Sequence, residues 1–397
     1  MKFIDEISFQ GQKVLMRVDF NVPLDDKSEV AGDNRIRAAL PGIRHILAGG
    51  GRLVLCSHLG RPGGRAAAEF SLKPVARRLG ELLKTGVPLA PDCIGPRAAE
   101  MVNNLQDGEV LLLENLRFHP GEAENSPKFA HALARLAAIY VNDAFAVSHR
   151  RHASIVGIPQ LTAECAAGFL IRREIRYFRQ AMQEPARPLV AIIGGAKVSS
   201  KLRMLENLLA RVDRLIIGGA MANTFLRAKG MNMGASLVEP DLVPAAAALL
   251  DKAERRGVKV YLPQDSVIAR ELSGDGPTKT VPVRDIPDGW LALDIGPVTV
   301  KSFAEAIREA KTIVWNGPPG AFELEPFRQG TTAIAREVGA SPALTIVGGG
   351  DTGLAVQRAG ETENMSYIST GGGAFLRFLE GRELPGLAAL HAAPAGG

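Results

Sequence analysis

The segment LVAIIGGAKVSSK, residues 189–201, contains the pattern that determines the fold. Five apolar residues are followed by two glycines, and the glycines by a polar segment with two lysines. A short run that is apolar at every position is typical of a strand buried on both faces, as parallel strands between helices are. The segment therefore predicts one unit of a parallel α/β sheet.

The same alternation of short apolar runs and longer helical patterns extends in both directions along the chain. Ten runs are predicted strands, at residues 14–18, 52–57, 110–115, 139–143, 189–195, 214–219, 258–263, 312–317, 344–350 and 367–373. Helices are expected between them, for example at 35–48 and 127–138. Ten strands fit two sheets better than one, and 397 residues at about 150 per domain predict two or three domains. We therefore predict an α/β protein with two parallel sheets.

A long amphipathic pattern, at about residues 164–183, separates the two halves. It ends before the stretch from Pro185 to Pro188, since proline cannot continue the interior of a helix. We predict a connecting helix here that acts as a hinge. The N-terminal domain would then cover residues 1–170 and the C-terminal domain residues 171–379, with the hinge helix counted in the latter.

The composition is that of a folded globular protein, with 46% hydrophobic and 22% charged residues. The formal net charge of +5 is shared between the halves, because residues 1–160 carry +3 and the remainder +2. A small surplus without a basic tail or stripe favours small anionic ligands over nucleic acid as partners.

The chain shows no signal for a membrane or for an oxidising compartment. No apolar run approaches the roughly 18 to 20 residues that span a bilayer, and Asp5 and Glu6 stand where a signal peptide would be apolar. We expect a cytoplasmic location. Cys56, Cys93 and Cys165 are far apart and form no CxxC arrangement, so they predict buried reduced thiols and indicate neither disulfides nor a zinc site.

The predicted strands of the first half end in cationic segments, and ligands of open parallel sheets bind beyond the carboxyl ends of the strands. These ends read DFN at 19–21, SHLGR at 57–61, ENLRFH at 114–119 and NDAFAVSHR at 142–150. Arg35 lies near the start of the helix after the first of these strands. Guanidinium groups match phosphate and carboxylate oxygens in pairs, so the segments predict a cleft for a small, multiply anionic metabolite. Taken singly, the arginines are also compatible with a solvated surface, His58 with a structural role and Asp19 with a turn or cap.

In the second half, glycine follows nearly every predicted strand, as in GGAKVSSK, NGPPGAFE, GGGDTG and STGGGA. Glycine allows a ligand to approach the backbone, and a following helix N-terminus attracts phosphate. Lys197 and Lys201 would share one face of a helix, where like charges repel unless an anion lies between them. The pattern predicts a phosphate site, although a Walker A loop is absent from the sequence.

Two other classes of function are compatible with parts of this pattern. GGGDTG at 348–353 matches GxGxxG, which suggests a dinucleotide-binding dehydrogenase, but the acid expected about 20 residues further on is missing. Asp351 within it either caps a helix or faces a metal carried by nucleotide phosphates. A non-catalytic anion-binding protein of the same fold is the other alternative.

The chain resembles the phosphoglycerate kinase family over essentially its whole length. Eleven motifs in register carry the resemblance: RVDFNVP, NRIRAALP, SHLGRP, ENLRFHPGE, YVNDAF, GGAKVSSK, MANTFL, DIGP, WNGPPGAFE, GGGDT and STGGGA. It implies two Rossmann-like α/β domains joined by the hinge helix. The N-terminal domain would bind 3-phosphoglycerate or 1,3-bisphosphoglycerate, the C-terminal domain MgADP or MgATP, and a tail at 380–397 would pack back near the N-terminal domain.

The resemblance also implies roles for individual residues. Phosphoglycerate would be bound by Asp19, Asn21, Arg35, His58, Arg61, Arg117 and Arg150. The nucleotide would be bound by Lys201, Asn316, Glu323, Gly349, Gly350, Asp351 and Thr352, with Asp351 facing Mg²⁺. Arg35, Lys197 and Gly372 would be the catalytic residues around the transferring phosphoryl group.

The implied reaction is a reversible, direct in-line transfer of the acyl phosphate of 1,3-bisphosphoglycerate to MgADP after hinge closure, carried out by a monomer. The acceptor is a carboxylate or a phosphate of ADP, both ionised at neutral pH, so no general base is needed. The chain departs from the family pattern at Ala146, Ser148, Pro319, Ala321 and Tyr367. None of these departures removes a charged group.

Overall fold

In the computed structural model, which describes residues 1–393, the chain divides within a single helix. Met1–Ile175 and the C-terminal segment from Glu383 form one unit, and Arg176–Arg382 form the other. The dividing helix is α6, Phe169–Met182. Within the described part of the chain, no helix combines the length and apolar character that a bilayer crossing requires.

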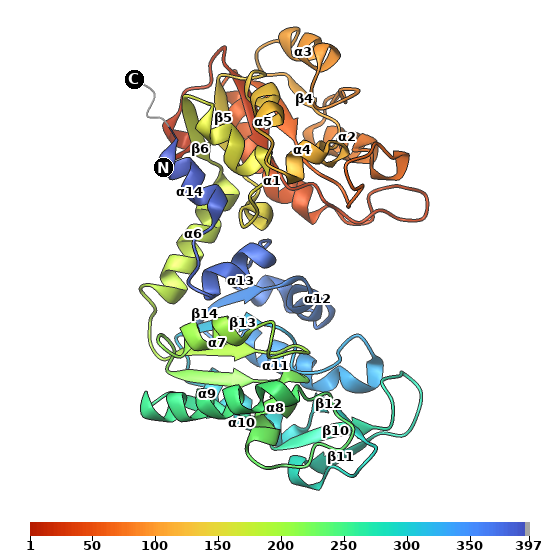
Figure 1. Ribbon diagram of the computed structural model, residues 1–397, viewed down its shortest axis with the longest axis vertical. Coiled ribbons are helices and arrows are strands. Elements are labelled where there is room, and N and C mark those ends of the chain that lie inside the picture. The colour runs from red at the N-terminus through yellow and green to blue at the C-terminus, as the bar shows by residue number, and fades with distance from the viewer. Residues whose placement is uncertain (394–397) are drawn as a thin grey trace. The chain divides into compact units, whose positions relative to one another are not determined.

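Unit 1 is built on a six-stranded sheet in the order β1-β6-β5-β2-β3-β4, in which every pairing is parallel (Figure 1). Its strands are β1 Lys2–Phe3, β2 Lys13–Arg17, β3 Arg52–Cys56, β4 Val110–Leu112, β5 Ile139–Asn142 and β6 Glu164–Ala167. Its helices are α1 Asn34–Ala48, α2 Lys73–Leu83, α3 Pro96–Asn103, α4 Pro120–Ala123, α5 Pro127–Ala134, the first half of α6 and α14 Pro385–Ala392. The chain runs from β2 outward to β4 on one side and continues with β5 on the other, so the sheet has a switch point between β2 and β5.

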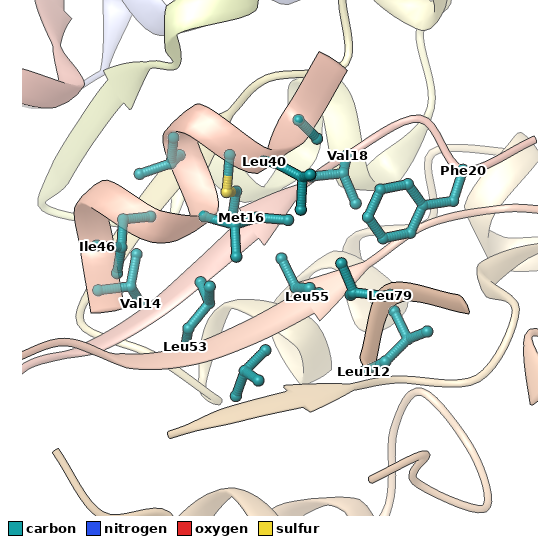
Figure 2. Packing of buried hydrophobic residues seen from close by; sticks show 14 of the residues in the cluster. Val14, Met16, Val18, Phe20, Leu40, Ile46, Leu53, Leu55, Leu79 and Leu112 are labelled. Carbon is teal, nitrogen blue, oxygen red and sulfur yellow. The ribbon is translucent and has the colours of Figure 1, made fainter. Parts of the chain in front are cut away.

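The core of unit 1 forms where alternate strand residues meet one face of α1 (Figure 2). Val14 and Met16 of β2 are fully buried there, together with Leu53 and Leu55 of β3. Helix α1 buries Ile36, Leu40, Ile43 and Ile46, whose spacing of three or four residues places them on one side of the helix. The periodicity that predicted strand and helix here is therefore the one that the packing uses.

The predicted helix at 164–183 is wrong in its first turn. Residues 164–167 form strand β6, which pairs with β1 and β5, and the helix begins only at Phe169. Gly168 separates the two, and a Cβ added to it would lie 2.3 Å from the side chain of Asp143. The amphipathic pattern continues across this boundary, but open pairing positions beside β5 convert the first four residues to a strand. The helix expected at 127–138 is also shorter, since α5 ends at Ala134.

Helix α14 packs on unit 1. Ala389 lies in a small cluster with Ala144, Val147 and Ile155, and the Gly386 amide donates to the Ser148 carbonyl at 2.9 Å. The last four residues of the predicted tail, 394–397, lie outside the described residues.

Unit 2 repeats the architecture with a second six-stranded parallel sheet, in the order β15-β14-β13-β7-β8-β9. Its strands are β7 Leu189–Ile193, β8 Arg214–Ile217, β9 Lys259–Tyr261, β13 Thr312–Asn316, β14 Leu344–Gly348 and β15 Tyr367–Ile368. Its helices are the second half of α6, α7 Leu202–Leu208, α8 Met221–Ala228, α9 Val243–Arg255, α10 Pro297–Arg308, α11 Gln329–Gly339, α12 Gly350–Arg358 and α13 Gly373–Leu379. The switch point lies between β7 and β13.

Unit 2 also contains an antiparallel sheet that the sequence analysis missed. It has the order β11-β10-β12, formed by β10 Asp265–Ala269, β11 Lys279–Pro282 and β12 Leu291–Ile295. Strand β11 is largely exposed, so it has no continuous apolar run to reveal it. All ten predicted strands are present, and the predicted class, α/β with two parallel sheets, is confirmed.

Asp143 and Asp294 are two of the buried carboxyl groups that hold backbone amides in these units. Asp143 Oδ1 accepts from the amides of Leu170 and Ile171 at the start of α6, at 2.8 and 3.2 Å. Its Oδ2 has no hydrogen-bond partner within residues 1–393. Asp294 accepts from the amides of Ile295 and Gly330. Burial raises the pKa of Asp143 and that of Asp294 to about 7 each, because a charged carboxylate loses hydration there.

The stability of the protein should therefore fall as pH rises. Both native pKa values lie above the ordinary 3.8, so the native state retains protons that the unfolded state has released. The stabilisation from these groups is complete below about pH 4 and is lost as pH rises through about 7. We expect the free energy of unfolding from urea titrations to decrease between about pH 5 and 8.

The Asp143→Asn and Asp294→Asn double variant should flatten this decrease, because the amide keeps an acceptor oxygen and does not ionise. The exposed Asp275→Asn is the matched control and should leave the slope unchanged. An unaltered slope in the double variant would contradict the assignment.

Candidate active site

The predicted substrate residues of unit 1 lie after four neighbouring parallel strands. Asp19 and Asn21 follow β2, His58 and Arg61 follow β3, Arg117 lies in the turn after β4, and Arg150 follows β5. The carboxyl ends of parallel strands share one edge of a sheet, and this edge includes the switch point between β2 and β5.

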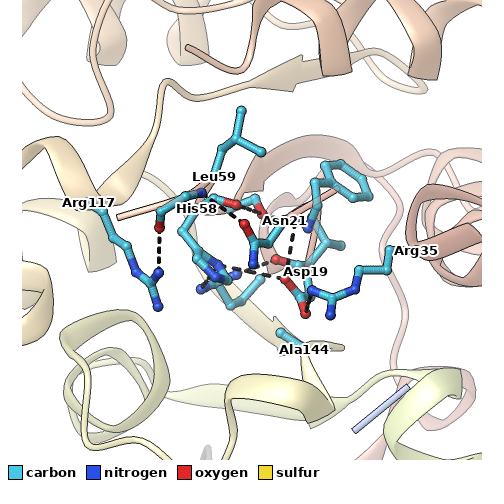
Figure 3. Close-up of polar contacts among 12 residues, drawn as sticks. Asp19, Asn21, Arg35, His58, Leu59, Arg117 and Ala144 are labelled. Carbon is cyan, nitrogen blue, oxygen red and sulfur yellow. Dashed lines mark hydrogen bonds and ion pairs between the residues drawn. The ribbon is translucent and has the colours of Figure 1, made fainter. Parts of the chain in front are cut away.

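Asp19 lies at the centre of these side chains (Figure 3). Its Oδ2 accepts from Nη1 of Arg35 at 2.8 Å, and its Oδ1 is 3.8 Å from Nδ1 of His58. Asn21 Oδ1 accepts from the Gly60 amide at 2.8 Å and so joins the β2 end to the β3 end. The Asp19 side chain is 10% exposed and the Arg35 side chain 39%, so the carboxylate is enclosed while the guanidinium reaches solvent.

Arg17, which the sequence analysis did not select, contacts this cluster from its buried side. It is the last residue of β2 and is fully buried. Its Nη2 is 3.1 Å from His58 Nδ1, and its Nε donates to Ser154 Oγ at 2.9 Å. The buried Glu122 supplies a countercharge through the same serine, whose amide and hydroxyl donate to it at 2.9 and 2.6 Å. A charged residue inside an apolar strand run was the signal that could have identified Arg17.

The environment of His58 keeps its ring neutral. Burial lowers the pKa of His58 well below 6.5, and the positive charges of Arg17, Arg117 and Arg35 lower it further. Because Arg17 has only donors to offer, Nδ1 of the neutral ring is the acceptor and Nε2 carries the proton. His58 is therefore an uncharged hydrogen-bond donor among cations.

Arg117 is held by the backbone and receives little charge compensation. Its Nη1 donates to the Gly60 carbonyl at 2.6 Å, which joins the β4 end to the β3 end. Burial lowers the pKa of Arg117 to about 10, and the charges of Arg17 and Arg150 lower it further. Crowded arginines with an excess of positive charge stabilise a bound anion. Arg61 is exposed and takes no part in the contacts that join the other residues.

In unit 2, the turns that follow β7 and β13 meet at the switch point between these two strands, backbone against backbone. A Cβ added to Gly194 would lie 2.2 Å from the Pro318 carbonyl oxygen, so the turns after the two strands are in direct contact. Gly195 and Gly317 next to this contact have positive φ angles of 117° and 96°. Only glycine adopts such angles without strain, which accounts for the glycines in these two motifs.

Lys201 is bound at the same edge. Its Nζ donates to the backbone and side-chain oxygens of Asn316, at 3.1 and 2.7 Å. Asn316 in turn donates through Nδ2 to the Gly348 carbonyl at 2.7 Å, and Thr352 Oγ1 accepts from the Gly317 amide at 2.7 Å. Burial lowers the pKa of Lys201 to about 8, against the opposing charge of Asp351. The structure thus brings these predicted nucleotide residues together at the ends of β13 and β14.

The other predicted residues of unit 2 make fewer contacts with this cluster. Gly350 and Gly372 face open space, since a Cβ added to either meets nothing within 4 Å, and Gly349 has a φ of 99°. Asp351 lies exposed in the first turn of α12. Glu323 and Lys197 are exposed and take no part in the hydrogen bonds around Lys201.

The prediction that Lys197 and Lys201 share a helix face is wrong. Helix α7 begins at Leu202, and residues 195–201 form bends and turns. Glu239, a residue that the sequence analysis missed, holds this segment. It accepts from Ser199 Oγ at 2.5 Å and from the Ser199 amide at 3.1 Å. Burial would raise the pKa of Glu239, but these bonds and the Val198 amide outweigh it and lower the pKa. Glu239 thus holds the segment that carries Lys197, and no local pattern indicates a partner 40 residues away.

Arginines crowd the switch point of one sheet, and glycine turns with a lysine lie at that of the other, features that fit an α/β enzyme acting on small phosphorylated anions. A family model described as phosphoglycerate kinase matches residues 4–382. The chain belongs to the phosphoglycerate kinase family.

Relatives and solved structures of that family match along the whole chain. A phosphoglycerate kinase of Desulfotalea psychrophila is 55% identical over 392 residues, which cover 99% of this chain and all of the relative. One of Geobacter metallireducens is 54% identical over 392 residues and 98% of each chain. The solved phosphoglycerate kinase of Coxiella burnetii has a TM-score of 0.89 at 41% identity, covering 98% of both chains. That of Pyrococcus horikoshii has a TM-score of 0.85 at 32% identity, covering 100% of both.

Nucleotide affinity should depend on the protonation of Lys201. With a pKa of about 8, this lysine loses its charge between about pH 7 and 9, and a neutral amine does not attract phosphate. At one unit above the pKa only about a tenth of it is charged, so the Kd for ADP should rise about tenfold by pH 9. Isothermal titration calorimetry in this range measures the effect. Lys201→Arg should not show the rise, since arginine stays charged, and an equal rise in both proteins would refute the assignment.

Releasing the Glu239 contact should slow turnover more than it weakens nucleotide binding. Glu239→Ala frees the segment around Ser199, and a misplacement of about 1 Å near the reacting group can cost up to about 10²-fold in rate. We expect kcat to fall at least roughly tenfold and the Kd for ADP to change much less. Glu239→Gln, which retains an acceptor, should recover part of the loss. Glu254→Ala, an exposed glutamate of α9, is the control. Unchanged kcat in Glu239→Ala would contradict the role.

Proposed function

We propose that the chain transfers the acyl phosphate of 1,3-bisphosphoglycerate to MgADP, reversibly and in line, and gives 3-phosphoglycerate and MgATP. Family membership establishes phosphotransfer between these substrates. The observation that carries the proposed geometry is the gathering of Arg17, Arg35 and Arg117 around a neutral His58, with Arg117 held by the Gly60 carbonyl and not by a carboxylate. An anionic phosphoglycerate would supply a countercharge to Arg117.

In this proposal, unit 1 binds the phosphoglycerate. The residues that bind it are Asp19, Asn21, Arg35, His58, Arg61, Arg117 and Arg150. Asp19 orients Arg35, and Asn21 fixes the Gly60 turn whose carbonyl holds Arg117. His58 donates from Nε2 to a substrate oxygen, and the arginines pair with phosphate and carboxylate oxygens.

Unit 2 binds the nucleotide through Lys201, Asn316, Glu323, Gly349, Gly350, Asp351 and Thr352. Lys201, between the Asn316 oxygens and Asp351, contacts the phosphates, while Glu323 contacts the ribose. The residues also fit Mg²⁺: Asp351 is an exposed carboxylate beside the open main chain of Gly350, and Mg²⁺ typically takes one or two carboxylates together with phosphate oxygens. When bound with the nucleotide, Mg²⁺ neutralises phosphate charge.

The transfer itself requires positioning and charge compensation. Arg35, Lys197 and the amide at Gly372 stabilise the equatorial oxygens of the transferring group. Neither acceptor needs deprotonation, which is consistent with a site built from arginines, lysine and main chain. Because the two substrates belong to different units, the reaction requires the units to close on the hinge helix and exclude water from the acyl phosphate.

We further propose that the chain works as a monomer in the cytoplasm, with small metabolites and without nucleic acid as partners. The evenly shared charge of +5 supports small anionic ligands over a polyanion.

A coupled assay that detects ATP formed from 1,3-bisphosphoglycerate and ADP tests the function directly. ATP formation that requires both substrates is expected, and its absence from the folded protein would favour a non-catalytic anion-binding protein. A titration with NAD tests the dehydrogenase alternative, and saturable NAD binding would support that alternative instead.

Arg35→Ala should lower kcat far more than it weakens nucleotide binding. Arg35 is in unit 1 and compensates charge that develops in the transition state, so its loss should cost about 10² to 10⁴ in kcat. Steady-state kinetics and ADP titrations measure the two effects separately. Arg37→Ala is the control, since Arg37 lies two residues further along α1 and pairs with Asp33. An unchanged kcat in Arg35→Ala would reject the role of Arg35.

A further inference from the structure

The side chains of Asp92, Cys93 and His119, all of types that bind metals, lie together at the β4 edge of unit 1. The proposed function uses none of them. Asp92 and Cys93 lie in the loop that follows Ala90, whose amide donates to the Leu112 carbonyl of β4 at 2.8 Å. His119 follows the short helical turn after β4. The loop that precedes β4 and the turn that follows it therefore lie at the same edge of the sheet. This brings together residues that are far apart in the sequence.

One ligand atom from each of these residues lies within 4.8 Å of the other two. His119 Nε2 and Asp92 Oδ1 are 2.7 Å apart. Thiolate, imidazole and carboxylate are the three ligand types of zinc sites, and bond lengths of about 2.0 to 2.3 Å place tetrahedral ligands about 3.3 to 3.6 Å from each other. The ion would replace the proton between Asp92 and His119, which requires that pair to open by about 0.6 Å.

The three groups are held in place by their neighbours. The His119 ring stacks on Phe129, with 5.3 Å between centroids and 30° between planes. The Cys93 amide donates to Asp92 Oδ1 at 2.6 Å, which fixes the carboxylate against its own loop. Cys93 is fully buried, whereas the Asp92 and His119 side chains are 46% and 29% exposed. The thiol thus lies on the buried side of the site, and water and ions can reach the site from the side of Asp92 and His119.

The ligand set is suited to a dication. Asp92 binds a metal as a carboxylate and Cys93 as a thiolate, because a coordinating thiol is deprotonated by the metal itself. A divalent ion therefore balances the charge of its two anionic ligands.

We propose that Asp92, Cys93 and His119 form a binding site for a borderline-soft divalent ion such as Zn²⁺, with water as the fourth ligand. Binding releases the Cys93 proton to solvent, and the His119 proton moves from Nε2 to Nδ1 so that Nε2 can coordinate. The thiolate selects against Mg²⁺ and Ca²⁺, which prefer oxygen ligands. The open fourth position makes this an exchangeable site, distinct from the phosphate and nucleotide sites. It is independent of the proposed function.

Cobalt substitution tests the proposal on the full-length protein. The protein is treated with a chelator, returned to metal-free buffer and titrated with Co²⁺ under reducing conditions. We expect one equivalent to produce a thiolate-to-cobalt charge-transfer band in the near ultraviolet, and Zn²⁺ but not Mg²⁺ to abolish it. Calorimetry with Zn²⁺ should report one site and proton release.

Cys93→Ser should remove the band. Cys165→Ser is the matched control, because Cys165 is also buried but its Sγ faces only the carbonyls of Pro159 and Thr162. His119→Gln and Asp92→Asn, which keep the thiol, should weaken Zn²⁺ by more than the roughly 10- to 100-fold that an outer-shell partner contributes. They also keep the proposal testable should Cys93→Ser fail to fold. The absence of a band in the wild type, or a band that survives in Cys93→Ser, would overturn the proposal, as would unaltered Zn²⁺ affinity in both His119→Gln and Asp92→Asn.

Discussion

The positions of the predicted ligand-binding residues depend on parallel pairing about a switch point in each sheet. In unit 1 the chain leaves β2 toward β3 and β4 and later continues at β5, and in unit 2 it leaves β7 toward β8 and β9 and continues at β13. In open parallel sheets, ligands bind at the carboxyl edge where the loops diverge to opposite sides. Asp19 follows β2 and Asn316 ends β13, so the central residue of each cluster lies next to its switch point. A single antiparallel partner at either position would have sent these loops to the opposite edge.

The two edges gather different chemical groups, which in our proposal bind two different anions. Unit 1 uses guanidinium side chains, and it buries Arg17 beneath His58 with Glu122 as a countercharge on the far side of Ser154. The histidine stays neutral because it is buried and its neighbours are positive, so it adds a directed donor without adding repulsion. In unit 2, Gly194 and Gly317 let two turns come into contact, and Lys201 donates to the oxygens of Asn316 beside them.

Two acidic residues, Asp143 and Glu239, hold backbone segments that lie near strand ends. Asp143 holds the first amides of α6, and Gly168 must remain without a side chain for that carboxyl to fit. Glu239 gives the segment around Ser199 a conformation that its helical spacing would not predict. Asp143 fixes the start of α6, whereas Glu239 fixes a turn that precedes α7. The cost of burying the Asp143 carboxyl is offset in part by the amides that donate to it.

The sequence by itself determined the periodicity of the elements and the chemistry of the motifs. Ten strands, two parallel sheets and residues at the strand ends, among them Asp19, His58, Arg117 and Lys201, could be predicted because apolar runs and strand-end residues are local signals, whereas Asn316 followed from the family resemblance. Tertiary structure alone decided that residues 164–167 form a strand, that Arg17 lies under His58, that Glu239 reaches Ser199 and that Asp92, Cys93 and His119 meet. Each of these depends on a partner distant in the chain, and such a contact forms only after the sheet has brought its segments to a common edge. The local sequence therefore encodes which groups are available, while the pairing order of the strands determines which of them touch.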